Sequence, residues 1–398
     1  MELGGKPGAE LKPQGFELRL SLLYATLFVP NAVHLAFFPL WLRDRGLSAV
    51  EISTLLAAPV LVRIFATPPV TFYADRSPER ANVMIAISAL SLSLSLLLAA
   101  DLSFSALFAL TCLISAVWSP QVPLADSMAL SGVRRFGVEF ASIRMWGSVS
   151  FLAVNIAAGL AIERFGSRAV PLMIMAAFAS VLLAACFMPR LGRRRRLSDA
   201  GLVPAGSKSL RRPEVLIFLT ATGLIQASHG YLYSFGSIYW KESGISADLV
   251  GFLWAAPVFA EIVLFNYYRR LFGRAQPEIF LLAAGGVAIV RWTLFPIIGS
   301  LGFGFSGFFF AQLLHGLSFG ATYLAQQNYL AHAVPEEQSG SAQGLAVFVH
   351  GILMAAVMFV SGPLYEVSKG AGFSAMAFIA LAGVGLGYWF SSLRAKET

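Results

Sequence analysis

Two oppositely charged residues lie in strongly apolar surroundings. Asp126 and Arg144 each belong to a stretch apolar enough to cross a bilayer, and only a short basic loop separates these stretches. A charged side chain at the bilayer centre costs about 2.5–3.5 kcal/mol on insertion scales. Opposite charges at similar depth on neighbouring helices therefore indicate a site that binds a polar substrate or moves protons. The alternative is a structural ion pair that holds the two helices together.

Glu261 is a second intramembrane carboxylate, and no Lys or Arg lies within one turn of it along the sequence. Burial of such a group favours its neutral form, so we predict that Glu261 loads and releases a proton. Its partner is either Arg291, in the next apolar stretch, or His315, in the one after. Arg291 would keep Glu261 ionised when near and permit protonation when displaced. His315 would relay the proton or orient Glu261, unless it only makes a structural hydrogen bond.

Arg63 leaves the intramembrane charges unbalanced. Three arginines, at positions 63, 144 and 291, stand against the carboxylates of Asp126 and Glu261, which gives a formal excess of one positive charge. An anionic substrate would neutralise this excess, because Arg pairs readily with a carboxylate in bidentate geometry. This interpretation favours an organic acid over a sugar. The alternative is that Arg63 extends toward the interface or contacts backbone carbonyls.

Several aromatic residues fall in stretches expected to reach a central cavity. Trp118, Trp146 and Tyr323 could stack on an aromatic substrate, although helix packing explains them equally well. We expect Trp41 and Trp240, at the ends of their stretches, to lie in the outer interfacial belt.

The composition places the chain among helical membrane proteins. Of 398 residues, 57% are hydrophobic and 13% charged, and the mean hydropathy is +0.71. The apolar runs are continuous rather than alternating, which excludes a β-barrel. The basic residues behind the net charge of +8 lie mostly between these runs and do not suggest nucleic acid. No nucleophile, phosphate loop or metal-ligand pattern is present, so we expect neither an enzyme nor a cofactor or metal.

The apolar runs give twelve transmembrane spans, since about 20 residues cross the hydrocarbon core. With both termini cytoplasmic, inner segments hold twenty Lys and Arg residues and outer segments six, as the positive-inside rule requires. The fold class is therefore all-α and polytopic, with two pseudo-symmetric six-helix bundles. The expected segments are a cytoplasmic tail (1–18), an N-terminal bundle (19–189), a cytoplasmic linker (190–212), a C-terminal bundle (213–393) and a C-terminal tail (394–398).

An internal repeat supports the two bundles. Gly46, Pro59 and Arg63 recur as Gly244, Pro257 and Glu261 with a constant offset of 198 residues. Such a repeat predicts pseudo-symmetric bundles with a cavity at their interface. It also puts Arg63 and Glu261 at equivalent positions.

Several motifs resemble the major facilitator superfamily. Asp75, Arg76 and Arg80, after the second span, are similar to a shortened form of its gating-loop signature. The sequence around Asp126 and Arg144 resembles the lactose permease and phenylpropionate permease branch of proton symporters. The pairs Ala260-Glu261 and Arg291-Trp292 and the triplet His315-Gly316-Leu317 resemble the phenylpropionate subgroup. Ser318 stands where lactose permease has a coupling glutamate.

This resemblance implies substrate binding by Asp126 and Arg144, and the charge balance and the expected cavity add Arg63, Trp146, Trp118 and Tyr323 as candidates. Because Ser318 replaces the coupling glutamate, proton coupling by Glu261, Arg291 and His315 is predicted from their own chemistry and not from the resemblance. We therefore expect an inner-membrane proton symporter that imports a small organic solute, most readily an aromatic carboxylate of the phenylpropionate type. The alternatives are a sugar or nucleoside symporter, a drug exporter, or a membrane receptor without coupling. The expected partners are substrate, protons and membrane lipids, and we expect a monomer.

Overall fold

The computed structural model describes residues 12–192, 210–272, 276–335 and 338–394. Most of the expected tails and linker, including Arg193 to Arg196, lie outside the described residues. Within the described part of the chain, all regular structure is helical.

The N-terminal half contains seven helical segments that form six rods. They are α1 (Phe16–Asp44), α2 (Ala49–Arg76), α3 (Arg80–Leu96), α4 (Phe104–Trp118), α5 (Gln121–Phe136), α6 (Phe140–Phe165) and α7 (Val170–Cys186). α4 and α5 make one rod that is interrupted at Ser119 and Pro120. α1 begins three residues before the expected bundle boundary.

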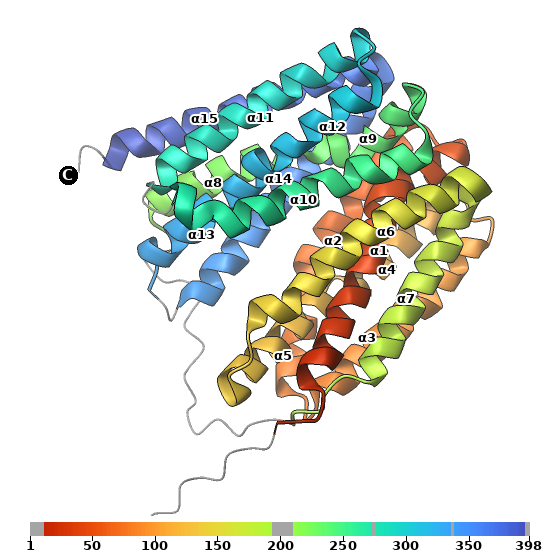
Figure 1. Ribbon diagram of the computed structural model, residues 1–398, viewed down its shortest axis with the longest axis vertical. Helices are drawn as coiled ribbons and strands as arrows, with labels where there is room; N and C mark the ends of the chain where they lie inside the picture. The colour runs from red at the N-terminus through yellow and green to blue at the C-terminus, as the bar shows by residue number, and fades with distance from the viewer. Residues whose placement is uncertain (1–11, 193–209, 273–275, 336–337, 395–398) are drawn as a thin grey trace, which may run out of the picture.

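The C-terminal half repeats this arrangement. Its helices are α8 (Pro213–Ala227), α9 (Gly230–Glu242), α10 (Ala247–Phe272), α11 (Pro277–Ser300), α12 (Gly304–His315), α13 (Ala321–Ala333), α14 (Ser339–Ser368) and α15 (Gly372–Arg394). α8 and α9 make one rod, and a π-helical turn at Gly316–Gly320 joins α12 to α13. The described residues therefore form two sets of six rods, which confirms the expected fold class (Figure 1).

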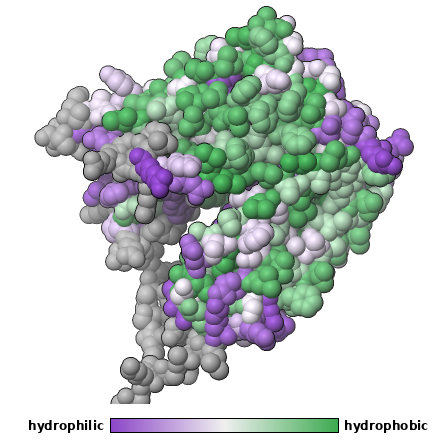
Figure 2. Space-filling view, in the orientation of Figure 1, coloured by the Kyte–Doolittle hydropathy of each residue, from purple (hydrophilic) through white to green (hydrophobic). Residues whose placement is uncertain are grey.

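The two halves touch mainly along three helix pairs, α1 with α9, α2 with α14 and α6 with α10. Near Asp44, Glu242 and Ser368 these helices are tightly packed, and we call this end the closed side. The halves separate toward the opposite end, where α1 begins at Phe16 and α15 ends at Arg394 (Figure 1). We call that end the open side and the space between the halves the central hollow. Figure 2 shows this gap, with hydrophilic residues around it.

Glycines permit the close packing on the closed side. A Cβ atom on Gly159 would lie 2.6 Å from the carbonyl oxygen of Ala247, and one on Gly251 would meet the carbonyl oxygen of Asn155. Small residues at helix crossings let backbones approach in this way. The two glycines come from α6 and α10, so each half supplies one of the close contacts.

Ionic contacts across the closed side link the same two halves. Arg43 lies 3.3 Å from Glu242, measured from Nη2 to Oε1. Lys241 lies 3.7 Å from Glu163, whose carboxylate also accepts a 2.7 Å hydrogen bond from the backbone N–H of Ala247. Lys241 and Glu242 are adjacent in α9, and each thus pairs with a residue of opposite charge in the N-terminal half.

The expectation for two tryptophans is wrong. Trp41 is 6% exposed and Trp240 is fully buried, with its ring centroid 5.7 Å from that of Trp254. α9 packs against α1 of the other half as well as against its own bundle. A tryptophan near the end of a span is therefore enclosed by protein here and does not face the lipid interface.

We predict that Gly251→Leu opens the closed side, because the added side chain would collide with the α6 backbone. The reporter is Ser237→Cys, which replaces a side chain that is 2% exposed, in a background where Cys112 and Cys186 are Ser. Labelling of this cysteine by a membrane-impermeant maleimide should become several-fold faster. Gly286→Leu is the control, since a Cβ atom there meets nothing within 4 Å. Equal labelling rates in both variants would contradict the prediction.

Candidate functional site

Asp126 of α5 and Arg144 of α6 meet at the wall of the central hollow. Arg144 Nε lies 3.8 Å from Asp126 Oδ1, and the two side chains are 33% and 36% exposed. Tyr24 of α1 donates a 2.5 Å hydrogen bond to the same carboxylate oxygen. The Arg144 guanidinium also lies over the ring of Phe28, 4.5 Å from its centroid. Three helices of the N-terminal half therefore position this ion pair.

Sequence reasoning missed Tyr24. Arg144 is the fifth residue of α6. No local signal distinguishes Tyr24 from the other ten tyrosines. Its role follows only from the packing of α1 against α5 and α6.

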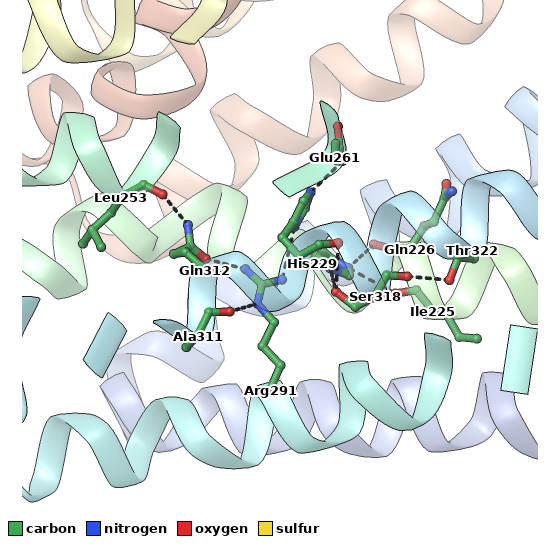
Figure 3. Close-up of polar contacts among 11 residues, drawn as sticks. Ile225, Gln226, His229, Leu253, Glu261, Arg291, Ala311, Gln312, Ser318 and Thr322 are labelled. Carbon is green, nitrogen blue, oxygen red and sulfur yellow. Dashed lines mark hydrogen bonds and ion pairs between the residues drawn. The ribbon is translucent and has the colours of Figure 1, made fainter. Parts of the chain in front are cut away.

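A second polar cluster lies in the C-terminal half and contains all three predicted coupling residues (Figure 3). His315 Nε2 lies 3.3 Å from Glu261 Oε1. On the other side of the imidazole ring, Arg291 Nη1 lies 3.2 Å from His315 Nδ1. His315 is thus the direct partner of Glu261, and Arg291 reaches the carboxylate only through the histidine.

The contact with Arg291 fixes the protonation of His315. A guanidinium only donates hydrogen bonds, so the imidazole Nδ1 must accept and cannot carry a proton. The neutral ring then holds its hydrogen on Nε2, the nitrogen that lies 3.3 Å from Glu261 Oε1. A second proton on His315 would require the contact with Arg291 to break.

Arg291 is fully buried, and neutral groups accept hydrogen bonds from two more of its five N–H donors. Nε donates to the carbonyl oxygen of Ala311 at 2.9 Å, and Nη2 donates to Gln312 Oε1. Gln312 Nε2 donates in turn to the carbonyl oxygen of Leu253 at 2.9 Å. This buried network spans α10, α11 and α12 and holds the guanidinium in place (Figure 3). Sequence reasoning did not identify Gln312.

A π-helical turn follows His315 directly, and such turns often occur at functional sites. Its first residue, Gly316, lies against α10, because a Cβ atom there would be 2.9 Å from the backbone carbonyl of Ala260. The absence of a side chain at Gly316 therefore lets His315 reach Glu261, the residue after Ala260.

A pocket of about 180 Å³ adjoins this cluster at the boundary between the halves. Leu35 and Phe151 line it from the N-terminal half, and Glu261 and His315 from the C-terminal half. The rest of its lining is mainly apolar and consists of Leu232, Tyr233, Trp254, Pro257, Val258 and Phe319. A larger hollow of about 370 Å³ beside Tyr239 and Gly370 has no charged side chain in its lining, so we place the site at the smaller pocket.

The other predicted binding residues are more dispersed. Tyr323 of α13 is 44% exposed and lies within electrostatic range of Arg144 and Asp126 across the hollow. Trp118 packs edge-on against His34 and Phe178, each at 5.5 Å between ring centroids, and so belongs to the core packing.

Trp146 and Arg63 both have exposed side chains. Trp146 is 48% exposed and lies two residues, or about 200° of helical rotation, beyond Arg144. Arg63 of α2 is exposed.

The three residues of the expected gating loop lie at the open-side end of α2 and the start of α3. Arg80 Nη2 lies 3.0 Å from Asp75 Oδ1, and Arg80 Nη1 donates to Ser131 Oγ of α5 at 3.1 Å. The guanidinium of Arg76 lies over the ring of Phe72. These contacts all fall within the N-terminal half.

Comparison with known proteins agrees with this architecture. A family model described as "MFS_1 like family" matches residues 17–376. The chain belongs to this family. It is a multi-pass membrane protein, and its relatives are transporters.

Two relatives of this MFS_1-like protein have named transport activities. A probable 3-phenylpropionic acid transporter of Escherichia coli is 28% identical over 91% of this chain and 94% of the relative. A maltose permease of Geobacillus stearothermophilus is 28% identical over 78% of each chain. Among solved structures, the nucleoside transporter NupG superposes with a TM-score of 0.81 at 15% identity, over 95% of this chain and 99% of that one. This last likeness concerns the fold alone.

We predict that Gly316→Val separates α12 from α10 and lengthens the contact between His315 and Glu261. Loss of this donor favours the neutral form of Glu261 already before substrate binds, so, if Glu261 takes up the proton, substrate-dependent proton uptake by the purified protein in detergent should fall several-fold. Gly344→Val is the matched control, because a Cβ atom at Gly344 meets nothing within 4 Å. Normal proton uptake by Gly316→Val would show that this close approach is not required.

Proposed function

We propose that the protein is a proton-coupled symporter that imports a small aromatic carboxylate by alternating access. The observation that carries this proposal is the position of Glu261. Its carboxylate lines the pocket between the halves, contacts His315, and has no direct contact with a cation among the described residues. A group in this position can exchange a proton with the hollow while the rest of its network stays buried.

Glu261 is the proton carrier in this proposal, and His315 orients it. As long as Arg291 donates to His315 Nδ1, the imidazole has no free site for a proton. A proton that enters the cluster therefore binds to Glu261. Loss of the carboxylate charge weakens its hydrogen bond from His315 Nε2, and this change couples protonation to the packing of α10 against α12 and the π-helical turn.

The pocket beside Glu261 suits the apolar end of an aromatic substrate. An engineered apolar cavity of about 150 Å³ binds benzene, and this pocket of about 180 Å³ has Phe151, Trp254 and Phe319 in its lining. Aromatic rings prefer offset or edge-on contacts with other rings. A sugar would leave several hydroxyl groups without partners against such a surface, which disfavours the maltose-like alternative.

The polar end of the substrate faces the N-terminal wall, where Asp126, Arg144 and Arg63 lie. An anion held there favours the protonated form of Glu261 electrostatically. By linkage, protonation of Glu261 raises the affinity for the anion by the same factor. The inward proton gradient across the inner membrane then drives uptake, with both termini in the cytoplasm and the open side facing the cytoplasm.

We predict that Glu261→Gln abolishes accumulation of 3-phenylpropionate driven by a pH gradient but preserves exchange of labelled for unlabelled substrate. Glutamine keeps the hydrogen bond from His315 but cannot take up a proton. The measurement is uptake by proteoliposomes under an imposed gradient, with maltose and uridine as competing substrates. Glu366→Gln, at an exposed glutamate near the closed-side end of α14, is the control. Full accumulation by Glu261→Gln would rule out this residue as the proton carrier.

A further inference from the structure

Arg63 faces the interior of the protein. Leu56 lies seven residues earlier on α2, within about 20° of the same direction around the helix, and is 6% exposed. Phe65 and Phe72, on the opposite face, are 68% and 47% exposed and point toward lipid. Arg63 is nevertheless exposed on this interior-facing side of α2, as expected of a side chain that faces the central hollow.

Arg63 has neither a hydrogen bond nor an ion pair among the described residues. The other two intramembrane arginines differ in this respect, because Arg144 lies beside Asp126 and Arg291 donates to His315, Ala311 and Gln312. Water in the open hollow can solvate Arg63, but once the hollow closes during transport an arginine without an acceptor would carry a large desolvation cost. The geometry therefore leaves one cation whose acceptor must come from outside the described chain.

Hydroxyl groups of the α4–α5 rod contact α2 one helical turn before and one turn after Arg63. Ser115 Oγ donates at 2.8 Å to the carbonyl oxygen of Pro59, the carbonyl one helical turn before Arg63. One turn after Arg63, Thr67 Oγ1 lies 2.9 Å from Ser119 Oγ. The two hydroxyls share a single hydrogen bond, so one O–H remains free to donate to a ligand.

We propose that Arg63, together with the hydroxyl pair of Thr67 and Ser119, forms the carboxylate-binding subsite of the transporter. Arg144 is the weaker candidate for this charge, since a carboxylate beside it also meets the negative charge of Asp126. Arg63 offers a full positive charge in bidentate geometry, and the free hydroxyl supplies a further donor.

This subsite also explains how the charge of the hollow stays constant during transport. Asp126 with Arg144, and Glu261 with Arg291, each sum to zero, so the empty site carries the single positive charge of Arg63. One proton on Glu261 and one carboxylate at Arg63 leave that sum unchanged. The loaded and empty forms can therefore change conformation with the same net charge.

The inference rests on the proposed function, and its test compares an acid with its neutral amide. Binding of 3-phenylpropionate and of 3-phenylpropionamide is measured on the purified full-length protein by calorimetry. We expect Arg63→Gln to weaken binding of the acid about 10- to 100-fold, the effect of removing charge-assisted hydrogen bonds, with less than about a threefold change for the amide. Thr67→Val should weaken acid binding about three- to tenfold.

Arg63→Lys and Arg164→Gln complete the test. Lysine keeps the charge but loses the bidentate geometry, so acid binding should fall between that of the wild type and that of Arg63→Gln. If Arg63→Gln does not fold, Arg63→Lys and Thr67→Val carry the comparison. Arg164, exposed at the closed-side end of α6, is the matched control and should leave both affinities unchanged.

Each contrary outcome has a distinct meaning. If Arg63→Gln retains the preference of the wild type for acid over amide, the subsite is refuted while symport of aromatic acids still stands. Equal losses for acid and amide would reduce Arg63 to a structural role. If the wild-type protein binds neither 3-phenylpropionate nor other aromatic carboxylates, both this subsite and the proposed substrate class are overturned.

Discussion

The contact between Arg291 and His315 is the interaction on which the site depends most. A fully buried guanidinium donates to one nitrogen of the imidazole, and this forces the other nitrogen to present its hydrogen to Glu261. Gln312 and the Ala311 carbonyl hold the guanidinium in turn. Because no member can take a proton without breaking a neighbour's bond, the ability to titrate is confined to the carboxylate at the edge of the network.

The two halves of the molecule bring complementary parts to the space between them. The C-terminal half supplies the cluster of Glu261, His315 and Arg291 and most of the aromatic lining of the pocket, whereas the N-terminal half supplies Phe151 to the pocket and carries Asp126, Arg144 and Arg63 outside its lining. A substrate that spans the hollow contacts both halves at once. Its binding energy is therefore available to draw them together, as alternating access requires.

The internal repeat places two residues of opposite charge at equivalent positions. Arg63 and Glu261 occupy equivalent positions in the two halves, 198 residues apart. Each residue lies about 14 residues, or about 21 Å, from the closed-side end of its helix. The same position of the repeat thus carries a fixed positive charge in one half and a titratable carboxylate in the other. This arrangement suits the proposed joint binding of an anion and a proton.

The sequence by itself determined the helical spans, the two six-rod halves and the candidate charges at positions 63, 126, 144, 261 and 291. It could do so because lipid requires long apolar runs, in which any charge is conspicuous. Only the tertiary structure decided that Tyr24 binds Asp126, that His315 separates Arg291 from Glu261, and that Trp240 is buried. These contacts join helices far apart in the chain, and an apolar helix shows no local difference between the face toward lipid and the face toward protein.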